Sequence, residues 1–374
     1  MDFGLSQDQG LLVDSVRGFL ADRVPIERVR TLREADCPND RDIWRSLAEL
    51  GVSGVLVDEE HGGSGLVLLD AVLLAQSLGY SVTPAPFVSS AVMAPLALAA
   101  HPGAQSSEWL RGIAAGEIAF GVAVTEVFSI REEAGVTLAG GEPGGRGEGK
   151  RRLHGKTMMA LDVRSADFVL VAVAADRLAV VRRDSGGLEA NHLATLDATR
   201  CTSELVFDGV EPEAVFEDAG DTIDRMLIAG RIALAADTLG ACESMIEQAV
   251  AYSKERVQFN RVIGSFQAVK HMCAEMIAEL EPARSLLWYA AHSFDSMPGD
   301  APLMSCHVLA HVSEIAREIA SVSTQVHGGT GWTDEQNLHF WFKRIAVARH
   351  LLGGPQFLRD RAAQIQGLDE RVAP

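Results

Sequence analysis

Apolar residues recur at helical spacing through the first third of the chain. The spacing is clear at Leu12, Val16, Phe19 and Leu20, and again at Ile43, Leu47 and Leu50. Residues three or four positions apart share one face of a helix, so both stretches are predicted to be amphipathic helices. Further helices are predicted over 66–78 and, after a proline-containing lead-in, over 85–100. Gly62-Gly-Ser-Gly65 suits a phosphate-binding loop, but a turn between helices is the simpler interpretation.

The pattern changes at about residue 118. Short apolar runs bounded by turn residues predict strands over 119–125, 168–174, 178–181 and 201–207. Residues 140–149 lie between the first two runs and contain six glycines, which is typical of a surface loop. The middle of the chain is therefore predicted to be a small antiparallel β domain.

The last third is again helical in pattern. Helices are predicted over 222–252, 266–292, 302–327 and 335–365, enough for an antiparallel four-helix bundle. One apolar stripe on the second of them comprises Phe266, Val269, Cys273, Met276, Leu280 and Leu287. The predicted fold is mainly α with a middle β domain, divided into an N-terminal helical domain (1–118), the β domain (119–220) and a C-terminal helical bundle (221–374).

Composition narrows the class of protein. The 374 residues are 47% hydrophobic and 22% charged, as in a globular enzyme, and 33 basic against 51 acidic residues give a net charge of −18. That charge opposes nucleic acid or an anionic membrane as a partner. The first residues lack a signal-peptide pattern, so a cytoplasmic location is expected. Five widely spaced cysteines, with no close pair, are expected to be reduced thiols rather than zinc ligands or disulfides.

Two C-terminal stretches carry the most specific signal. They are Arg256-Val-Gln-Phe-Asn-Arg-Val-Ile-Gly-Ser-Phe-Gln-Ala-Val-Lys-His271 and Gln325-Val-His-Gly-Gly-Thr-Gly331. Further landmarks precede them in order at 5–9, 51–65, 124–126, 153–156 and 197–200. Together these segments resemble the acyl-CoA dehydrogenase family along the whole chain. The resemblance implies FAD as cofactor, oxidation of an acyl-CoA substrate to the 2,3-enoyl-CoA, electron-transfer flavoprotein as acceptor, and a homodimer or homotetramer, or a heterotetramer with another family subunit.

In that family the two stretches reach across a subunit interface to a neighbour's FAD. Carried over, the guanidinium of Arg256 pairs with the pyrophosphate, and Gly328 and Gly329 let the backbone approach the dinucleotide closely. The remaining expected contacts on this half are Gln258, Phe259, Gln267 and Gln325. Taken singly, Arg256 is more simply a solvated helix arginine and the glycine pair the end of a helix, so the flavin interpretation depends on all the segments together.

The flavin-ring half departs from the family pattern. The ring contacts implied by the resemblance are Val124, Thr125, Met158 and Ala160, and the implied substrate contacts are Ser129 and Arg225. Residues 127–131 replace the usual Pro-x-Ala-Gly-Ser-Asp, and residues 158–162 replace a Trp-Ile-Thr-Asn-like stretch. The chain is therefore expected to hold its own flavin ring poorly while lending contacts to a partner.

The usual catalytic glutamate is also missing. Counting from Arg344 in the family's register places Gly353 at that position, and glycine cannot accept a proton. A minority of the family places the base at the start of the first bundle helix, where this chain has Asp224. The alternative is that Asp224 only favours the helix dipole in a first turn capped by Asp221 or Thr222. The hypotheses are thus a dehydrogenase with Asp224 as base, or a non-catalytic subunit that completes a partner's FAD site. No metal site is expected.

Overall fold

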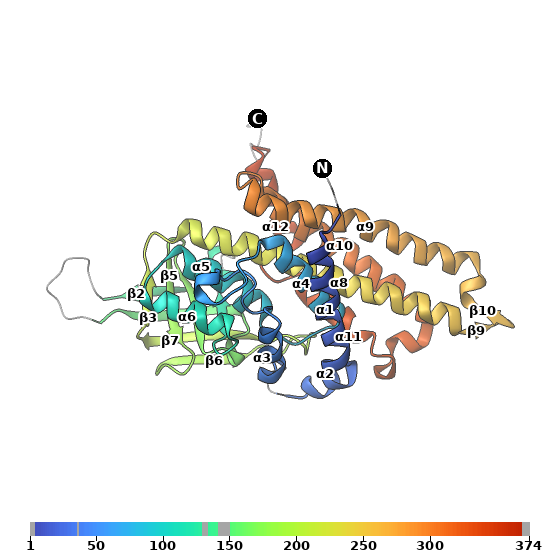
Figure 1. Cartoon of the computed structure of the whole chain (residues 1–374), viewed down its shortest axis with the longest axis horizontal. Coiled ribbons are helices and arrows are strands. Elements are labelled where there is room, and N and C mark those ends of the chain that lie inside the picture. The colour runs from blue at the N-terminus through green and yellow to red at the C-terminus, as the bar shows by residue number, and fades with distance from the viewer. Residues whose placement is uncertain (1–3, 36, 129–133, 141–149, 369–374) are drawn as a thin grey trace.

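Helices lie at both ends of the chain and a sheet lies between them (Figure 1). The computed structural model describes residues 4–35, 37–128, 134–140 and 150–368. The sheet occupies one end of the molecule, and the helices that follow it extend to the other end (Figure 1). This arrangement confirms the predicted fold class.

The N-terminal helices form where the apolar spacing predicted them. The first begins at a capping box, in which the Gln9 main-chain N–H donates to Ser6 Oγ over 3.1 Å and the Ser6 N–H donates to Gln9 Oε1 over 3.0 Å. Residues 62–65 connect two helical elements, in agreement with the simpler interpretation of that segment. The elements are α1 (Gln7–Arg23), α2 (Ile26–Leu32), α3 (Arg41–Glu49), η1 (Glu59–His61), α4 (Leu68–Tyr80), the π-helical η2 (Phe87–Met93), α5 (Ala94–Ala100) and α6 (Ala104–Ala114).

The middle segment forms one sheet with the order β6-β7-β3-β1-β4-β5-β8 and with β2 paired to β3. The strands are β1 (Phe120–Ala123), β2 (Gly135–Ala139), β3 (Arg152–Leu161), β4 (Phe168–Val173), β5 (Arg177–Arg182), β6 (Leu188–His192), β7 (Thr202–Val210) and β8 (Ala214–Phe216). Two short helices, α7 (Thr125–Phe128) and η3 (Val163–Ser165), interrupt the strand sequence. Residues 141–149 of the predicted glycine-rich loop lie outside the described residues.

The sheet differs from the prediction in one pairing, because β1 and β4 run parallel. Both faces of β4 are covered. Val169, Val171 and Val173 enter a smaller core within the sheet domain, whereas Leu170 and Ala172 enter the main core shared with the helices. A strand buried on both faces reads as a continuous apolar run, which does not reveal the direction of its neighbour.

Three of the four predicted C-terminal helices are present with slightly extended ends: α8 (Gly220–Glu255), α9 (Gln267–Ser296) and α10 (Ala301–His327). The prediction of a single helix over 335–365 is wrong. That region forms three separate elements: η6 (Asp334–Gln336), α11 (His339–Ala348) and α12 (Pro355–Ile365). The break follows from the backbone, because Leu352 and Gly353 have φ of 54° and 108°, and Pro355 starts the next helix. The N-cap of α8 is Ala219, so Asp221 and Thr222 lie inside the helix rather than capping it.

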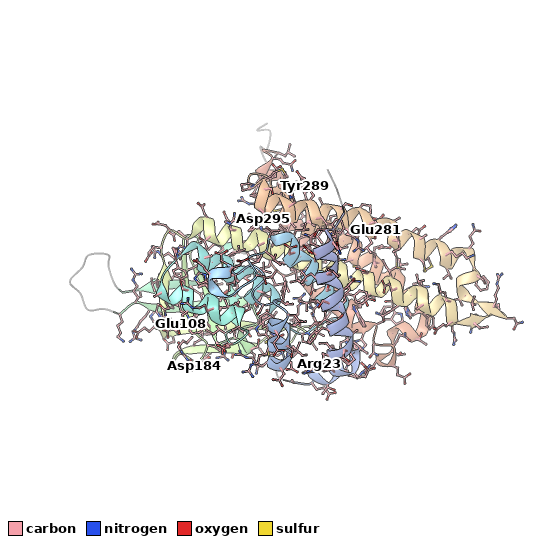
Figure 2. All side chains as sticks on the ribbon, viewed as in Figure 1. Arg23, Glu108, Asp184, Glu281, Tyr289 and Asp295 are labelled. Carbon is pink, nitrogen blue, oxygen red and sulfur yellow. The ribbon has the colours of Figure 1, made fainter. Side chains whose placement is uncertain are left out.

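Helix α8 packs against α4, α9, α10 and α11 and so joins the N-terminal helices to the bundle. Helix α9 is also hydrogen-bonded to α4. The carboxylate of Asp295 on α9, labelled in Figure 2, accepts a hydrogen bond from the Leu68 N–H at the start of α4 over 3.0 Å. Burial raises the pKa of Asp295. None of the helices formed by the described residues is both long enough and apolar enough to cross a membrane.

Candidate functional site

The first signature stretch forms a hairpin that projects from the end of the bundle (Figure 1). Strands β9 (Val257–Gln258) and β10 (Arg261–Val262) follow α8 and lead through η4 (Ile263–Ser265) into α9. Phe259 and Asn260 at the tip have φ of 49° and 61°, as a two-residue turn of type I′ requires. The Phe259 side chain is 88% exposed, and Arg256, Gln258 and Gln267 are exposed as well. These predicted FAD contacts therefore face away from this chain's own core.

The second stretch begins at the end of α10 and continues through η5 (Gly328–Trp332). Gly328 has φ of 63°, and a Cβ added at Gly328 or Gly329 would meet no atom within 4 Å. The backbone of both glycines, and the side chain of Gln325, therefore border open space. The first stretch thus exposes side chains such as Phe259, and the second exposes the backbone of Gly328 and Gly329. A large ligand or the surface of a partner could bind to both.

Tyr252 brings the two stretches together. It lies one turn before Arg256 on α8, and its ring stacks on that of His327 at a centroid distance of 4.7 Å. The Thr330 hydroxyl donates to the Tyr252 hydroxyl over 3.3 Å. His327 is buried, with Nδ1 2.8 Å from the Ser323 carbonyl oxygen, and burial lowers its pKa. These contacts fix His327 at the end of α10, where the second stretch leaves the helix.

The predicted ring contacts lie on two adjoining segments of the sheet domain. Val124 is buried just after β1, Thr125 begins α7 rather than ending the strand, and Ala160 is buried in β3. The Met158 N–H donates to Glu126 Oε1 over 3.1 Å. Glu126 thus joins the two segments and accepts the hydrogen bond of the Met158 amide. The predicted substrate contact Ser129 lies outside the described residues.

Gly353 lies in the turn between α11 and α12, where neighbouring side chains leave no space for a side chain at this position. Its φ is 108°, and a Cβ added there would lie 2.8 Å from Phe357 Cδ1. Phe357 also contacts Phe128 of α7, with ring centroids 5.7 Å apart. The position that the sequence analysis assigned to the usual base is therefore packed by aromatic side chains.

Arg231 completes this cluster from α8. Its Nε donates to the Leu352 carbonyl oxygen over 2.9 Å, and its Cζ lies 5.8 and 5.9 Å from the ring centroids of Phe128 and Phe357. Arg231 is 7% exposed, and burial lowers its pKa. Among the described residues it forms no ion pair, and Asp224 attracts it only at longer range. We call Phe128, Arg231 and Phe357 the closing cluster.

Asp224 lies elsewhere on α8. It precedes Arg231 by seven residues, about 10 Å along a helix axis, and its side chain is exposed. It lines a hollow of about 200 Å³ with Arg225, whose guanidinium carbon lies 4.4 Å above the Phe294 ring. The structure thus brings the two predicted residues Asp224 and Arg225 together, but it does not bring Asp224 to the Gly353 turn.

A buried charge network that the sequence reading missed fixes the orientation of α11. Arg344 Nε and Nη2 donate to the two carboxylate oxygens of Asp237 on α8, over 2.9 and 2.6 Å, and Arg200 Nη2 donates to the same group over 2.5 Å. Arg344 also donates to Thr199 Oγ1 over 2.8 Å. Burial opposes ionisation of Asp237, but the two arginines hold its pKa below the usual range. The sequence did carry a signal for this network, because Asp237 lies within an apolar run of α8 and a buried acid needs a charged or hydrogen-bonding partner.

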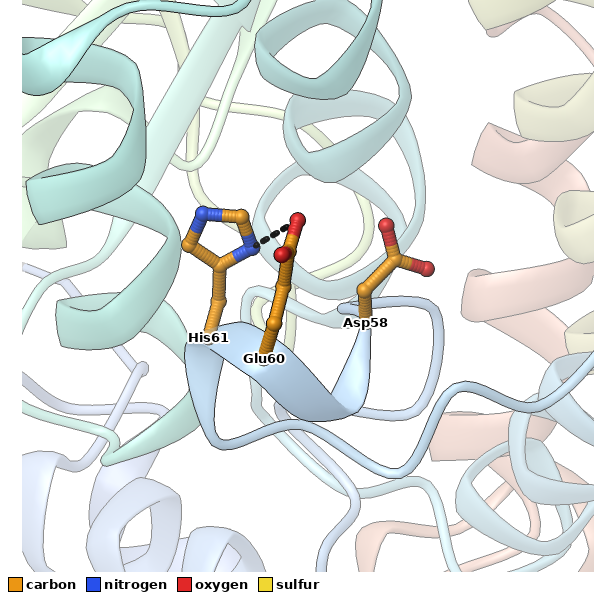
Figure 3. Close-up of side chains that lie close together, drawn as sticks. All are labelled: Asp58, Glu60 and His61. Carbon is orange, nitrogen blue, oxygen red and sulfur yellow. Dashed lines mark ion pairs between the residues drawn. The ribbon is translucent and has the colours of Figure 1, made fainter.

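One further group has ligand-forming side chains close together. The side chains of Asp58, Glu60 and His61 gather on the turn around η1, with His61 Nδ1 3.7 Å from Glu60 Oε1 (Figure 3). Asp58 and Glu60 are exposed, and exposed acidic groups like this are common without an ion. We assign this group no role.

FAD fits one half of the predicted site and not the other. Exposed Arg256 and Phe259 and the open backbone at Gly328 and Gly329 suit the phosphate and adenosine portions. On the ring side, the Met158 N–H already donates its hydrogen bond to Glu126, and the closing cluster fills the space next to Gly353.

Comparison with known proteins agrees with this architecture. Residues 6–117 match the family description "Acyl-CoA dehydrogenase, N-terminal domain" and residues 220–366 match "Acyl-CoA dehydrogenase, C-terminal domain". Acyl-CoA dehydrogenase IpdE2 of Mycobacterium tuberculosis is 30% identical over 359 residues, covering 94% of each chain.

Two solved structures share the fold. One is named as a Tcur3481-Tcur3483 steroid ACAD G363A variant, with a TM-score of 0.85, 27% identity, and coverage of 96% of this chain and 98% of that one. The other is the ChsE4-ChsE5 complex of Mycobacterium tuberculosis, with a TM-score of 0.87, 24% identity and full coverage of both chains. The family matches span most of the sequence, so the chain belongs to the acyl-CoA dehydrogenase family.

Proposed function

We propose that this chain is the base-free subunit of a heteromeric acyl-CoA dehydrogenase. In such a complex it completes the FAD site of a catalytic partner subunit. The complex oxidises an acyl-CoA thioester to the 2,3-enoyl-CoA and passes electrons to an electron-transfer flavoprotein. FAD, when bound, supplies the hydride acceptor for this chemistry.

The observation that carries the proposal is the packing around Gly353. Removing an α-proton from a thioester requires a carboxylate in a dry pocket. Here the position has no side chain, and the closing cluster occupies its surroundings, with Phe357 2.8 Å from where a Cβ would stand. A charged group that contacts this turn is the buried guanidinium of Arg231, which is a hydrogen-bond donor and not a base.

The exposed signature stretches support the lending role. Phe259 is 88% exposed at the hairpin tip, an unfavourable position for a phenyl ring in water. Burying it against a partner's adenosine group would recover that free energy. Arg256 would bind the pyrophosphate through its planar donors, while the Gly328 and Gly329 backbone would lie against the dinucleotide. The Tyr252 contacts hold the two segments together for this purpose.

Two names among the similar proteins point the same way. The steroid ACAD structure and the ChsE4-ChsE5 structure are each named for two different proteins. At 27% identity, the first supports a two-component assembly for this chain as well. Its name also makes a bulky, polycyclic acyl group a reasonable substrate class for the complex.

The test is to purify the chain alone and together with a catalytic family member encoded next to it. We expect a colourless chain alone and a yellow, active complex when both are present. The Arg256→Ala variant should lower the flavin content of that complex, whereas Arg111→Ala, at an arginine on α6, should leave it unchanged. Flavin bound by the chain alone and bleached by acyl-CoA would contradict the proposal.

The second candidate is a self-sufficient dehydrogenase that uses Asp224 as base. The hollow that Asp224 shares with Arg225 and Phe294 favours it, because a carboxylate, a cation and an aromatic ring meet there. This candidate requires that the chain alone oxidise acyl-CoA and that Asp224→Ala abolish turnover while flavin stays bound. Activity that survives Asp224→Ala excludes it.

A further inference from the structure

Two thiols meet where the N-terminal helices contact the sheet. Cys37 lies in the loop between α2 and α3, and Cys201 lies directly before β7. The side chain of each cysteine is the largest influence on the pKa of the other, so the two thiols lie next to each other. Cys201 is buried and Cys37 is partly exposed. Both are free thiols, as the sequence predicts, but the structure places them side by side across the boundary between helices and sheet although they lie far apart in sequence.

Hydrogen bonds on both sides hold this contact in place. Asn39 Nδ2, two residues from Cys37, donates to Asp162 Oδ1 over 2.9 Å and to Ser165 Oγ over 2.8 Å. The Asp162 N–H in turn donates to the Cys201 carbonyl oxygen over 2.7 Å. The segments that carry the two thiols are therefore both hydrogen-bonded to residues 162–165. These bonds hold the Cys37 segment next to the Cys201 segment.

We propose that Cys37 and Cys201 form a redox-responsive pair that closes to a disulfide on exposure to a peroxide. The Cys37 thiolate attacks a peroxide oxygen, which gives a sulfenic acid on Cys37 and releases water from hydrogen peroxide. The Cys201 sulfur then attacks the Cys37 sulfur, and the sulfenic oxygen leaves as a second water. The two thiols are oxidised and one peroxide is reduced.

The roles of the two cysteines follow from their surroundings. Cys37 is the one that a solvent-borne oxidant reaches first. The neighbouring Cys201 thiol lowers the pKa of Cys37, whereas the Cys37 thiol and burial raise the pKa of Cys201. Since the thiolate is the reactive form, Cys37 is the attacking residue and Cys201 the resolving one.

Closure would link the N-terminal helices covalently to the sheet. Cys201 follows Arg200, which binds Asp237 on α8, so the bond would form beside the junction of all three regions. A cross-link between residues far apart in sequence restricts the unfolded chain, and oxidation is therefore expected to raise the melting temperature.

The test is to treat the full-length chain with hydrogen peroxide, block the remaining thiols with N-ethylmaleimide and map the peptides by mass spectrometry. We expect a linked peptide pair containing Cys37 and Cys201, lighter by two hydrogen atoms than the separate peptides and lost again on reduction. Recovery of both peptides alkylated, or of Cys37 only as sulfinic or sulfonic acid, would overturn the proposal.

Serine variants give a second readout. Cys37→Ser and Cys201→Ser should each abolish the rise in melting temperature on oxidation, while Cys273→Ser, at a half-buried thiol on α9, should retain it. If a serine variant does not fold, the peptide map of the unaltered chain decides alone. A rise in melting temperature that persists in folded Cys37→Ser would show that another modification causes it.

Discussion

The guanidinium of Arg231 donates a hydrogen bond from Nε to the carbonyl oxygen of Leu352 over 2.9 Å, which joins the middle of α8 to the turn that contains Gly353. A buried cation usually has an acidic partner, because removing it from water costs several kcal/mol. Here the partner is a backbone carbonyl together with two aromatic rings within about 6 Å. The turn to which we assign the missing base is therefore occupied by a hydrogen-bond donor and by apolar packing.

Two adjacent glycines provide a matched test of that packing. Gly353→Ala is expected to destabilise the chain by about 1–3 kcal/mol, because the new methyl group would overpack against Phe357. The left-handed backbone at φ 108° adds strain for any residue with a Cβ. At Gly354 the nearest atom to an added Cβ is 4.0 Å away, so Gly354→Ala should change stability little. Urea unfolding of the two variants measures the difference.

The same geometry predicts that Gly353→Glu does not create a dehydrogenase. The glutamate would have to displace Phe357 and would arrive beside the Arg231 guanidinium. Arg231 would then hold the carboxylate ionised but pair with it, so it would not be free to accept a proton. Anaerobic mixing of the complex with acyl-CoA should show no flavin bleaching beyond that of the partner subunit, and extra bleaching would refute the prediction.

Phe259 is predicted to matter for assembly and not for folding. Because its side chain is 88% exposed, Phe259→Ala should leave the unfolding free energy of the isolated chain unchanged. Its loss from an interface centre should weaken assembly with the partner by about 2–4 kcal/mol. Leu196, 68% exposed in the sheet domain, is the control. Calorimetry that shows equal losses for Phe259→Ala and Leu196→Ala would contradict the prediction.

How far the sequence predicts this molecule depends on whether the signal is local. The spacing of Leu12, Val16 and Leu20 defines a helix face without help from the rest of the chain, and that helix is present. The parallel pairing of β1 with β4 depends on strands far apart in sequence, and a continuous apolar run fits either direction. The Gly353-Gly354-Pro355 break carried a local signal, which an assumed continuous helix over 335–365 overrode.

The candidate site divides in the same way. Arg256, Phe259 and the Gly328-Gly329 pair were predicted as FAD contacts from their motifs, and all of them are exposed in the structure. Arg231 was missed because an arginine in an apolar helix gives no indication of which carbonyl it meets. Its contact with Leu352 depends on how α8 and the α11–α12 turn pack, and Asp237, Arg200 and Arg344 fix that packing.

The Asp237 network is expected to be one of the most costly places to disturb. Asp237→Ala leaves Arg200 and Arg344 buried without their carboxylate, which should destabilise the chain by about 3–5 kcal/mol. The matched control is Asp184, labelled in Figure 2, whose ion pair with Arg182 is exposed on both sides. Asp184→Ala should cost at most about 1 kcal/mol. Urea unfolding at neutral pH compares the two, and similar losses would show that the buried network adds no stability.

The Asp237 carboxylate also predicts that the protein loses stability in acid. The folded pKa of Asp237 lies below its unfolded value, so its contribution to stability is complete above the unfolded pKa, near about 3.9, and falls as the pH drops through the folded pKa. The unfolding free energy should therefore decline below about pH 4. In Asp237→Ala that part of the decline should be absent, which unfolding curves across the acid range would reveal.

His327 predicts a second pH dependence at milder acidity. Burial lowers its folded pKa, so between the unfolded value, near about 6.5, and the lower folded value the unfolded chain binds more protons. Stability should accordingly fall as the pH drops through this window and stay reduced below it. His327→Gln cannot titrate, so the slope of unfolding free energy against pH should be shallower in the variant. An unchanged slope would show that His327 keeps its ordinary pKa when folded, despite its stack on Tyr252 and its bond to Ser323.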